Sequence, residues 1–394
     1  MLPLEGVKIL DFSRVVVGPI CTQVLGDLGA DVYKVESIGS GDYSRTFLVS
    51  EEHDGESFSF MALNRNKRSI CLDVRQPEGK EIALTLVEEC DVVVQNFRPG
   101  VMARLGLDYH SLKQRKPDII YASASGFGQT GPYSRKPGQD MLAQAIGGVA
   151  WLNGERDGPP VPSGAIIADH LAGMLLVQGI LAAMWSREMT GKGQEVDVAL
   201  LDGILHLQSE FATAFLNSGQ PQAKNTRPIN RFYRAKDDKW LALAGTFGTE
   251  PVRDVCLALG LPDLSQDDRF NTWEKANYAY ANELEAIFAE RFASRTREEW
   301  LAVMEDKGIL CAPVHSYAET FSDPQVLHNE SIVEFDHPRA GRVRGIAYPI
   351  KFSETPAEVR LPPPLLGQHT DEILAMLGYS AERVRELRAK NVVA

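Results

Sequence analysis

The first 36 residues alternate between strand-like and helix-like segments, and this alternation leaves few architectures open. VKILDF (residues 7–12) and DVYKVE (31–36) are short apolar runs typical of buried strands, and GPICTQVLGDLGA between them is a helical segment. Together they form a β-α-β unit, in which two strands lie parallel in the same sheet. The opening segment therefore predicts a parallel sheet.

The same alternation continues as far as about residue 200. SICLDV (69–74) precedes a helix expected from Pro77 to Glu89, with proline in its first turn, and the strands DVVVQN, IIYASAS (119–125) and EVDVALL follow. Strands that alternate with helices predict an α/β fold with a mostly parallel sheet covered on both faces.

A polar stretch from Ser218 to Lys239 ends this pattern and indicates a crossing to a second unit. The segment from Trp240 to about Ala318 holds one strand, WLALAG, and amphipathic helices such as ANELEAIFAERFAS. Later β-like pieces and a final helix are expected to rejoin the first unit. We predict a large domain over 1–218, a linker and smaller α+β domain over 219–322, and a return to the large domain over 323–394.

Charge and cysteine content narrow the classes of partner. The chain carries 41 Lys and Arg against 53 Asp and Glu, a formal charge of −12, which argues against nucleic acid or an anionic membrane as a partner. Five scattered cysteines without CxxC spacing and the start MLPLEGVKIL indicate a cytoplasmic setting and predict no metal site. The apolar run Leu171–Trp185 is shorter than the ~20 residues of a membrane span, so we expect a core helix.

Asp169 stands near the expected start of that apolar helix, in IADHLAGM, and two explanations apply to it. An aspartate near a helix N-terminus complements the free N–H groups and the helix dipole. Alternatively, a carboxylate with an ordinary pKa of ~3.9 is an anion at neutral pH and can act as a nucleophile without a neighbouring base.

Three basic segments are expected at one edge of the sheet. QNFRPGVMARLGLD places Arg98 and Arg104 around a Pro-Gly turn after a strand, NRNKRS carries Lys67, and the glycine-rich GFGQTGPYSRKPGQD carries Lys136. Guanidinium groups at the carboxyl edge of a parallel sheet suit phosphate. The first turn, SRVVVGP, lacks the GxGxxG pattern, which argues against nicotinamide or flavin binding.

These segments, in this order, resemble the class III coenzyme A transferases, also called the CaiB/BaiF type, which include formyl-CoA, carnitine and succinyl-CoA:dicarboxylate transferases. The resemblance rests on DFSRVVVGPICTQVLGDLGADVYKVE, NRNKRSICLDV, QNFRPGVMARLGL, SGFGQTGPY, IADHLAGM and PPPLLGQHT, and covers nearly the whole chain. It implies that Asp169 is catalytic. It also implies a binding site for the CoA ester made by Val16, Val17, Lys67, Asn96, Phe97, Arg98, Arg104, Lys136, Gln139 and Asp140.

The resemblance further implies a Rossmann-like large domain, a small domain and an interlocked homodimer. The substrates would be an acyl-CoA and a small carboxylic acid, with no tightly bound cofactor. Formyl-CoA transferase has glutamine where this chain has Val16, and a run of glycines where this chain has AGTFGTE (244–250). Both differences argue against oxalate and formate as substrates.

The resemblance implies covalent transfer through aspartyl anhydride and aspartyl-CoA thioester intermediates at Asp169. The alternative is an α-methylacyl-CoA racemase, which has this fold and aspartate but adds a histidine in a GHD-like segment. Here Gln139 precedes Asp140, and His170 should point roughly 100° away from Asp169 on a helix. A CoA-binding protein without catalysis would leave Asp169 unexplained.

The acids exchanged are open at this point. The basic side chains near the inter-domain crossing could hold the far carboxylate of a dicarboxylic acid, although solvated linker charges explain them as well: Arg227, Arg231 and Arg234.

Overall fold

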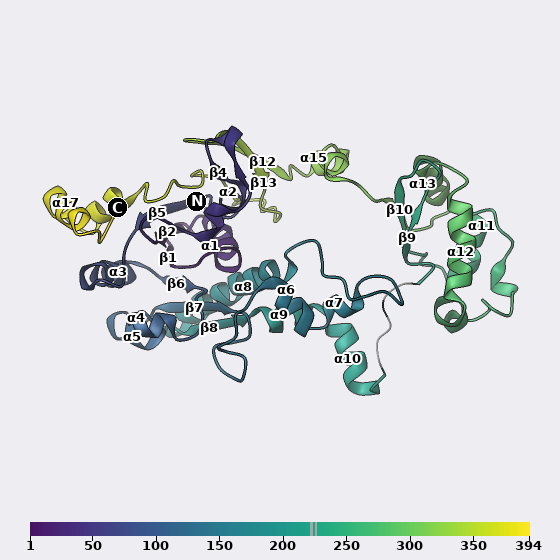
Figure 1. Cartoon of the computed structure of the whole chain (residues 1–394), viewed down its shortest axis with the longest axis horizontal. Coiled ribbons are helices and arrows are strands. Elements are labelled where there is room, and N and C mark those ends of the chain that lie inside the picture. The colour runs from purple at the N-terminus through teal and green to yellow at the C-terminus, as the bar shows by residue number, and fades with distance from the viewer. Residues whose placement is uncertain (221–223, 225–226) are drawn as a thin grey trace. The chain divides into compact units, whose positions relative to one another are not determined.

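The computed structural model describes residues 1–220, 224 and 227–394, and these form two compact units (Figure 1). Unit 1 contains residues 1–150, 162–220 and 330–394, and unit 2 contains residues 151–161 with the described part of 221–329. The sequence-based bounds differ most at residues 151–161, which they assign to the large domain, and by a few residues at the two other crossings, where the units change after 220 and after 329. Part of the linker expected over 218–239 lies outside the described residues.

Unit 1 is built on a six-stranded sheet in the order β5-β2-β1-β6-β7-β8. Every neighbouring pair of strands is parallel, as the alternation of segments predicts. The strands are β1 (Lys8–Asp11), β2 (Asp31–Glu36), β5 (Lys67–Cys71), β6 (Val92–Gln95), β7 (Ile120–Ser125) and β8 (Glu195–Ala199).

The direction of winding reverses between β1 and β6, which are neighbours in the sheet. Ile9 of β1 pairs with Val32 of β2 on one side and with Val92 of β6 on the other. The chain therefore leaves β1 toward one edge of the sheet and leaves β6 toward the other edge. The loops after the two strands diverge, and in open parallel sheets such a crevice at the carboxyl ends is where ligands bind.

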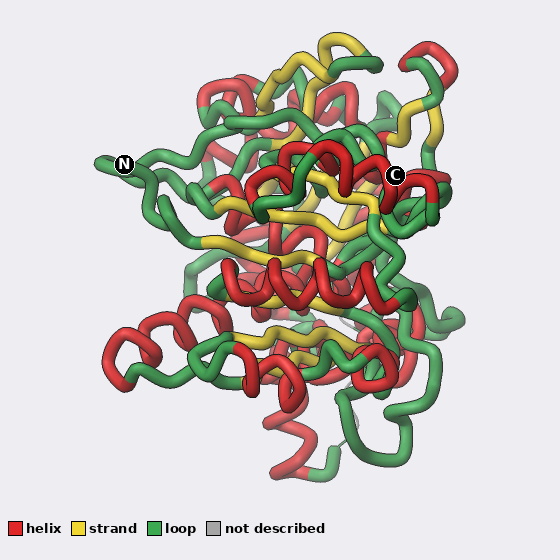
Figure 2. Tube along the Cα trace, turned by 90° about the vertical axis from the view of Figure 1, so that its left-hand side faces the viewer, coloured by secondary structure: helices red, strands yellow, loops and turns green. Residues whose placement is uncertain are grey.

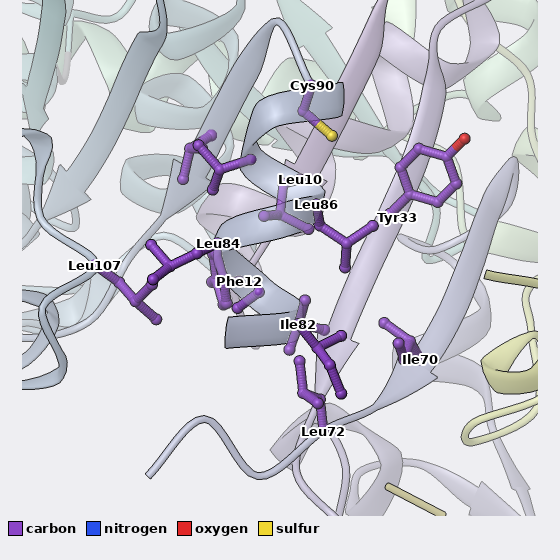
Figure 3. Packing of buried hydrophobic residues seen from close by; sticks show 14 of the residues in the cluster. Leu10, Phe12, Tyr33, Ile70, Leu72, Ile82, Leu84, Leu86, Cys90 and Leu107 are labelled. Carbon is purple, nitrogen blue, oxygen red and sulfur yellow. The ribbon is translucent and has the colours of Figure 1, made fainter. Parts of the chain in front are cut away.

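Successive residues of the strands face opposite sides of the sheet, and each side has its own apolar core. Leu10, Tyr33 and Ile70 pack beneath α3 (Pro77–Glu89), as Figure 3 shows. Ile9 and Val92 belong to the second core, on the face covered by α1 (Val17–Asp27) and α8 (Ile167–Thr190). In Figure 2 the strands, in yellow, accordingly run between layers of red helix.

The close contact between α1 and α8 depends on a glycine in α8. A Cβ atom at Gly173 would lie 2.3 Å from the Ile20 side chain and 2.8 Å from the carbonyl oxygen of Val17. Only a residue without a side chain lets the start of α1 approach α8 this closely. The two helix starts are thereby held side by side.

The other elements of unit 1 surround this sheet. After β2 come η1 (Tyr43–Thr46), β3 (Val49–Ser50), η2 (Glu51–His53), β4 (Glu56–Ser57) and α2 (Phe58–Met61). The later ones are α4 (Val101–Leu105), α5 (Tyr109–Arg115), α6 (Asp140–Ile146), α7 (Val149–Leu152, which reaches unit 2), α9 (Leu200–Leu207), α10 (Ser209–Ser218), β12 (Ile332–His337), β13 (Gly341–Ile346), α16 (Thr370–Met376) and α17 (Ala381–Ala389).

Unit 2 combines helices with a three-stranded antiparallel sheet, β11-β10-β9. Its core holds a ring stack of Tyr233 on Phe292, with centroids 4.7 Å apart, and Trp300, whose indole N–H donates to the Phe292 carbonyl at 2.8 Å. Its elements are β9 (Arg231–Arg234), β10 (Trp240–Leu243), α11 (Pro251–Ala258), η3 (Leu264–Gln266), η4 (Lys275–Ala279), α12 (Ala281–Phe292), α13 (Arg297–Asp306), β11 (Cys311–Pro313), α14 (Tyr317–Thr320) and α15 (Pro324–His328).

Helix α8 is longer and less covered than the sequence predicts. It spans 24 residues, and the side chains of Trp185 and Met189 are each 70% exposed, so the expected core helix has one open apolar face. By length and composition alone it is the one helix among the described residues that could cross a membrane, a test that core helices of soluble proteins also pass.

Candidate active site

A cleft of about 1270 Å³ lies at the reversal between β1 and β6, within unit 1. The loops after β1, β6 and β7 form one part of its lining, and the start of α8 forms another. The face of α1 and the segment 346–349 after β13 complete it. The volume suits a ligand larger than a typical drug molecule, for which pockets measure ~300 to 1,000 Å³.

Asp169 lines this cleft as the third residue of α8, yet it is not the residue that caps the helix. Asp140, the first residue of α6, accepts the backbone N–H groups of Ala168 at 2.6 Å and Asp169 at 3.2 Å through Oδ1. A side chain outside the helix therefore does what an N-cap side chain ordinarily does.

Asp140 is itself held in place by Gln144, one turn further along α6. The Gln144 amide donates to Asp140 Oδ2 at 2.6 Å, and its oxygen accepts the N–H group of Ser163 at 2.8 Å. Asp140 and Gln144 are both buried. The start of α8 is consequently fixed without any contribution from the Asp169 carboxylate.

The Asp169 carboxylate makes no hydrogen bond or ion pair with any of the described residues, although its side chain is partly buried. Burial, followed by the nearby charge of Asp140, raises the pKa of Asp169 to about 7. A carboxylate without a partner and with a strongly raised pKa, placed in a cleft, is typical of a catalytic group. The explanation that Asp169 only complements the helix dipole does not account for this geometry.

Removing the Asp140 charge should shift the acid limb of the pH–rate profile. We expect Asp140→Asn to lower the pKa of Asp169 because one of its two causes disappears, while burial still keeps the pKa above its ordinary value. The fall in kcat/KM on acidification should then begin at a lower pH than in wild type. Glu89→Gln removes one negative charge from an exposed residue and is the matched control; equal shifts in both variants would contradict this interpretation.

Nine of the residues selected from the sequence line the cleft together. They are Val16, Val17, Asn96, Phe97, Arg98, Lys136, Gln139, Asp140 and Asp169. Arg104 lies on α4, exposed, and is not among the lining residues.

Lys67 requires a correction, because its side chain is fully buried and does not line the cleft. Its ammonium group lies 3.2 Å from Asp11 Oδ2 and donates to the Pro19 carbonyl at 3.0 Å and to the Asn64 amide oxygen at 2.9 Å. A group held by three acceptors inside the protein does not reach a phosphate in the cleft. The sequence pattern NRNKRS cannot distinguish a buried counter-ion from a ligand contact.

Asp11 and Lys67 belong to a buried quartet of charges beneath the loop after β1. Lys34 Nζ lies 2.9 Å from Asp42 Oδ2, and the side chains of both residues are fully buried, as are those of Asp11 and Lys67. Two positive and two negative charges balance, which is the condition under which such groups are tolerated inside a protein.

His170 also lines the cleft, beside Asp169 in the sequence, although the helical geometry separates their directions by roughly 100°. Burial lowers the pKa of His170, so it is largely neutral at pH 7. Gln139, at the position of the racemase histidine, lines the cleft as well but cannot take a proton. Because His170 lines the cleft, its direction on the helix does not by itself exclude a racemase.

Sequence reasoning missed the apolar part of the cleft. Ile20 and Val24 continue the face of α1 that begins at Val17, and Met174 and Tyr348 add to it. The spacing of positions 17, 20 and 24 is a helical stripe that a reading of α1 could have found. Tyr348 follows β13, some 180 residues after Asp169, and no local signal places it there.

The arginines near the inter-domain crossing have local partners within unit 2. Arg231 contacts Glu155 at 2.5 Å and Glu285 at 2.8 Å, and Arg234 contacts Asp238 at 3.0 Å. The Arg227 guanidinium lies over two aromatic rings, those of Trp273 and Tyr278. Arg231 and Arg234 are thus neutralised by carboxylates of the chain itself.

Comparison with known proteins establishes the family. The family model for CoA-transferase family III matches residues 4–370. This chain belongs to CoA-transferase family III. It is 36% identical to a mouse succinyl-CoA:glutarate CoA-transferase over 400 residues, which cover 100% of this chain and 91% of the relative. It is also 36% identical to a formyl-CoA:oxalate CoA-transferase from Rhodopseudomonas palustris, covering 98% and 96%.

A solved structure of a CaiB/BaiF family protein from Brucella suis has the same fold. It superposes with a TM-score of 0.82 at 34% identity and covers 95% of this chain and 99% of its own. As a family III member the chain is a CoA-transferase, with CoA thioesters and carboxylic acids as its substrate classes.

Among the described residues no group of three or more His, Cys, Asp or Glu side chains could hold a metal ion.

Proposed function

We propose that this enzyme transfers CoA between carboxylic acids through covalent intermediates on Asp169. The observation that carries the proposal is the Asp169 carboxylate, which lies in the cleft with its oxygens free and its helix start held by Asp140. A nucleophile must keep an unshared oxygen that can reach the substrate, and a raised pKa makes that oxygen more basic.

In the first half-reaction the Asp169 carboxylate attacks the thioester carbonyl carbon, and the carbon–sulfur bond breaks. The products are a mixed anhydride and CoA thiolate. The thiolate then attacks the aspartyl carbonyl carbon of the anhydride, which releases the donor acid and leaves an aspartyl-CoA thioester. Each step exchanges one activated acyl group for another, so no external energy source is required.

The second half-reaction reverses these steps with the acceptor acid. Its carboxylate attacks the aspartyl thioester, which gives a new anhydride and again frees the thiolate. Attack of the thiolate on the acceptor's carbonyl carbon forms the new acyl-CoA and regenerates Asp169. The cleft must hold the thiolate and exclude water throughout, because both activated intermediates would otherwise hydrolyse.

For the nucleotide end of CoA, we propose that Arg98 and Lys136 bind the phosphates at the carboxyl edge of the sheet. Both line the cleft and both are exposed, so their charges are available to a ligand. Phe97 lies beside them, with the Arg14 guanidinium 4.9 Å from its ring centroid. Arg104 is exposed on α4 and does not line the cleft, and its contact with CoA stays a prediction from the resemblance.

For the acids, we propose short dicarboxylic acids as the first candidates. Relatives named for succinyl-CoA and glutarate match nearly the whole chain, at 36% identity. The relative named for oxalate is equally similar, but Val16 and the segment AGTFGTE (244–250) depart from the formyl-CoA transferase pattern.

The decisive experiment separates a transferase from a racemase. Labelled glutarate or another free acid, incubated with succinyl-CoA and enzyme, should yield labelled acyl-CoA. A 2-methylacyl-CoA incubated in deuterated water should acquire no enzyme-dependent deuterium at its α-carbon, because a transferase never breaks that bond. Rapid α-exchange without CoA transfer to any acid tested would favour the racemase, with His170 or Asp140 as the proton-transfer partner.

We also propose that the protein is an interlocked homodimer, as the resemblance implies, and that it is cytoplasmic, as its cysteine pattern suggests. Large apolar side chains lie open on α8 and α10, among them Trp185, Met189 and Leu216, which is 79% exposed. An exposed apolar surface of this kind is typical of a protein–protein interface. All five cysteines are free thiols, consistent with a reducing compartment. Sedimentation on dilution should show a dimer that does not dissociate in native buffer, and a folded monomer would contradict it.

A further inference from the structure

Side chains from other parts of unit 1 hold the loop after β1 by hydrogen bonds to its backbone N–H and C=O groups. Asn96 Oδ1 accepts the N–H group of Arg14 at 2.8 Å, and Asn96 Nδ2 donates to the carbonyl oxygen of the same residue at 2.7 Å. Asp42 Oδ1 accepts the next N–H group, that of Val15, at 3.0 Å. The ammonium group of Lys34 donates to the carbonyl of Ser13 at 2.8 Å. Three separate elements of the fold thus hold three successive residues.

These contacts maintain a backbone conformation that the sequence disfavours. Val15 has φ = 69°, in the left-handed region, and a β-branched residue rarely adopts that region. A strained residue persists only where its surroundings over-determine it, and such residues concentrate at functional sites. Asn96, Asp42 and Lys34 supply that over-determination here.

The held loop leads directly to the cleft and to the nucleophile. The strained Val15 itself lines the cleft, as do Val16 and Val17 after it. Val17 begins α1, and its carbonyl oxygen lies against Gly173 of α8, one turn beyond Asp169. Any shift of the loop therefore moves the wall of the cleft relative to the carboxylate that must attack.

We propose that Asn96 is a positioning residue, which fixes the Ser13–Val17 loop so that the thioester lies at the correct distance from Asp169. This inference rests on the proposed function. It differs from the role implied by resemblance, in which Asn96 contacts CoA. The Asn96 amide oxygen accepts from the Arg14 N–H group and its nitrogen donates to the Arg14 carbonyl, so the side chain is anchored to the loop.

The two roles predict opposite kinetics for Asn96→Ala. If Asn96 positions the loop, kcat falls by about 10- to 100-fold, because small misplacements of reacting groups have effects of that size. The KM for acyl-CoA and the affinity for CoA itself, measured by calorimetry, should stay within about twofold of wild type. If Asn96 binds CoA, KM and the dissociation constant rise together while kcat is largely preserved, and the proposal is wrong.

Hydrogen exchange of backbone amides tests, without any turnover, whether Asn96 holds the Ser13–Val17 loop. In Asn96→Ala the amides of Arg14 and Val15 should exchange faster than in wild type, since one has lost its acceptor and the other the rigidity of its neighbour. Unchanged exchange across residues 14–17 would overturn the proposal. Because exchange needs no substrate, it separates failure of this inference from failure of CoA transfer itself, which would show as inactive wild-type enzyme.

Thr370→Val is the matched control for lost stability. Thr370 is buried, accepts one hydrogen bond from Cys71 N–H and donates one to the Gly367 carbonyl, outside the cleft. Loss of the Thr370 hydroxyl should lower the melting temperature, as Asn96→Ala does, but leave kcat unchanged. An equal fall in kcat in both variants would attribute the effect to stability and contradict the proposal.

Val15→Gly keeps the proposal testable if Asn96→Ala does not fold. Glycine adopts φ = 69° without strain but also many other conformations, so all hydrogen bonds can form while the loop is less restricted. We expect a fall in kcat smaller than that of Asn96→Ala, together with faster exchange across residues 14–17. A normal kcat in a folded Val15→Gly variant with faster exchange across residues 14–17 would show that loop position does not limit the reaction.

Discussion

Asp169→Asn abolishes CoA transfer and leaves CoA bound. An amide is nearly the same size as a carboxylate but has no anionic oxygen, so the anhydride cannot form, and we expect kcat to fall at least about a thousandfold. The helix start stays in place because Asp140 caps it. The affinity for CoA, measured by calorimetry, should remain within about twofold of wild type.

Trapping experiments test the same prediction directly. Wild-type enzyme incubated with acyl-CoA and then with hydroxylamine or borohydride should carry a modification in the peptide that contains Asp169. The Asn variant should carry none. A wild-type peptide that stays unmodified during turnover, or a loss of CoA affinity equal to the loss of rate, would contradict a covalent role for Asp169.

The raised pKa of Asp169 adds a stability signature to this variant. The folded-state pKa of about 7 lies above the ordinary value of 3.8, so folding binds the proton more tightly than the unfolded chain does. The contribution of Asp169 to stability is therefore fully present below about pH 4 and is lost as the pH rises from there through about 7. Asp169→Asn avoids this decline, and its melting temperature should exceed that of wild type at pH 8 but not at pH 4.

Much of the fold could be predicted because it is encoded locally. The apolar runs that precede each predicted helix are the strands of the parallel sheet, and the helix predicted over Pro77–Glu89 has those bounds in the structure. Local patterns do not report what covers a helix from outside. The apolar run Leu171–Trp185 indicated a buried helix, whereas Trp185 is largely exposed.

The part of the site that lies in loops directly after strands could be predicted from the sequence. Loops after β1, β6 and β7 meet at the reversal of the sheet, and this brings Val16, Asn96 and Lys136 together with Asp169. Contacts between distant segments were not predictable, such as the capping of α8 by Asp140. These depend on tertiary packing and have no counterpart in local spacing.

The second large effect that we expect is a loss of stability when Lys67 is replaced. Lys67→Met removes one positive charge from a buried quartet that is otherwise balanced, and leaves Asp11 with an uncompensated negative charge. Breaking a buried pair in this way typically costs about 3–5 kcal/mol. We expect a loss of that size in the free energy of unfolding from urea titration.

Lys136→Met is the matched comparison, because both lysines were expected from sequence to face CoA. Lys136 is exposed and lines the cleft, so its loss should change stability by less than about 0.5 kcal/mol and raise the KM for acyl-CoA. Lys67→Met should show the reverse pattern, with any folded enzyme retaining a normal KM. A raised KM in Lys67→Met without loss of stability would return that lysine to the CoA site.

Removing both partners of the buried pair tests whether the charges of Asp11 and Lys67 are coupled. The double variant Asp11→Asn, Lys67→Met restores the charge balance, since one positive and one negative group are both lost. It should therefore recover part of the stability that Lys67→Met alone removes, as a positive coupling in a double-mutant cycle. Additive losses would mean that Lys67 stabilises the fold through its hydrogen bonds to Pro19 and Asn64 and not as the counter-ion of Asp11.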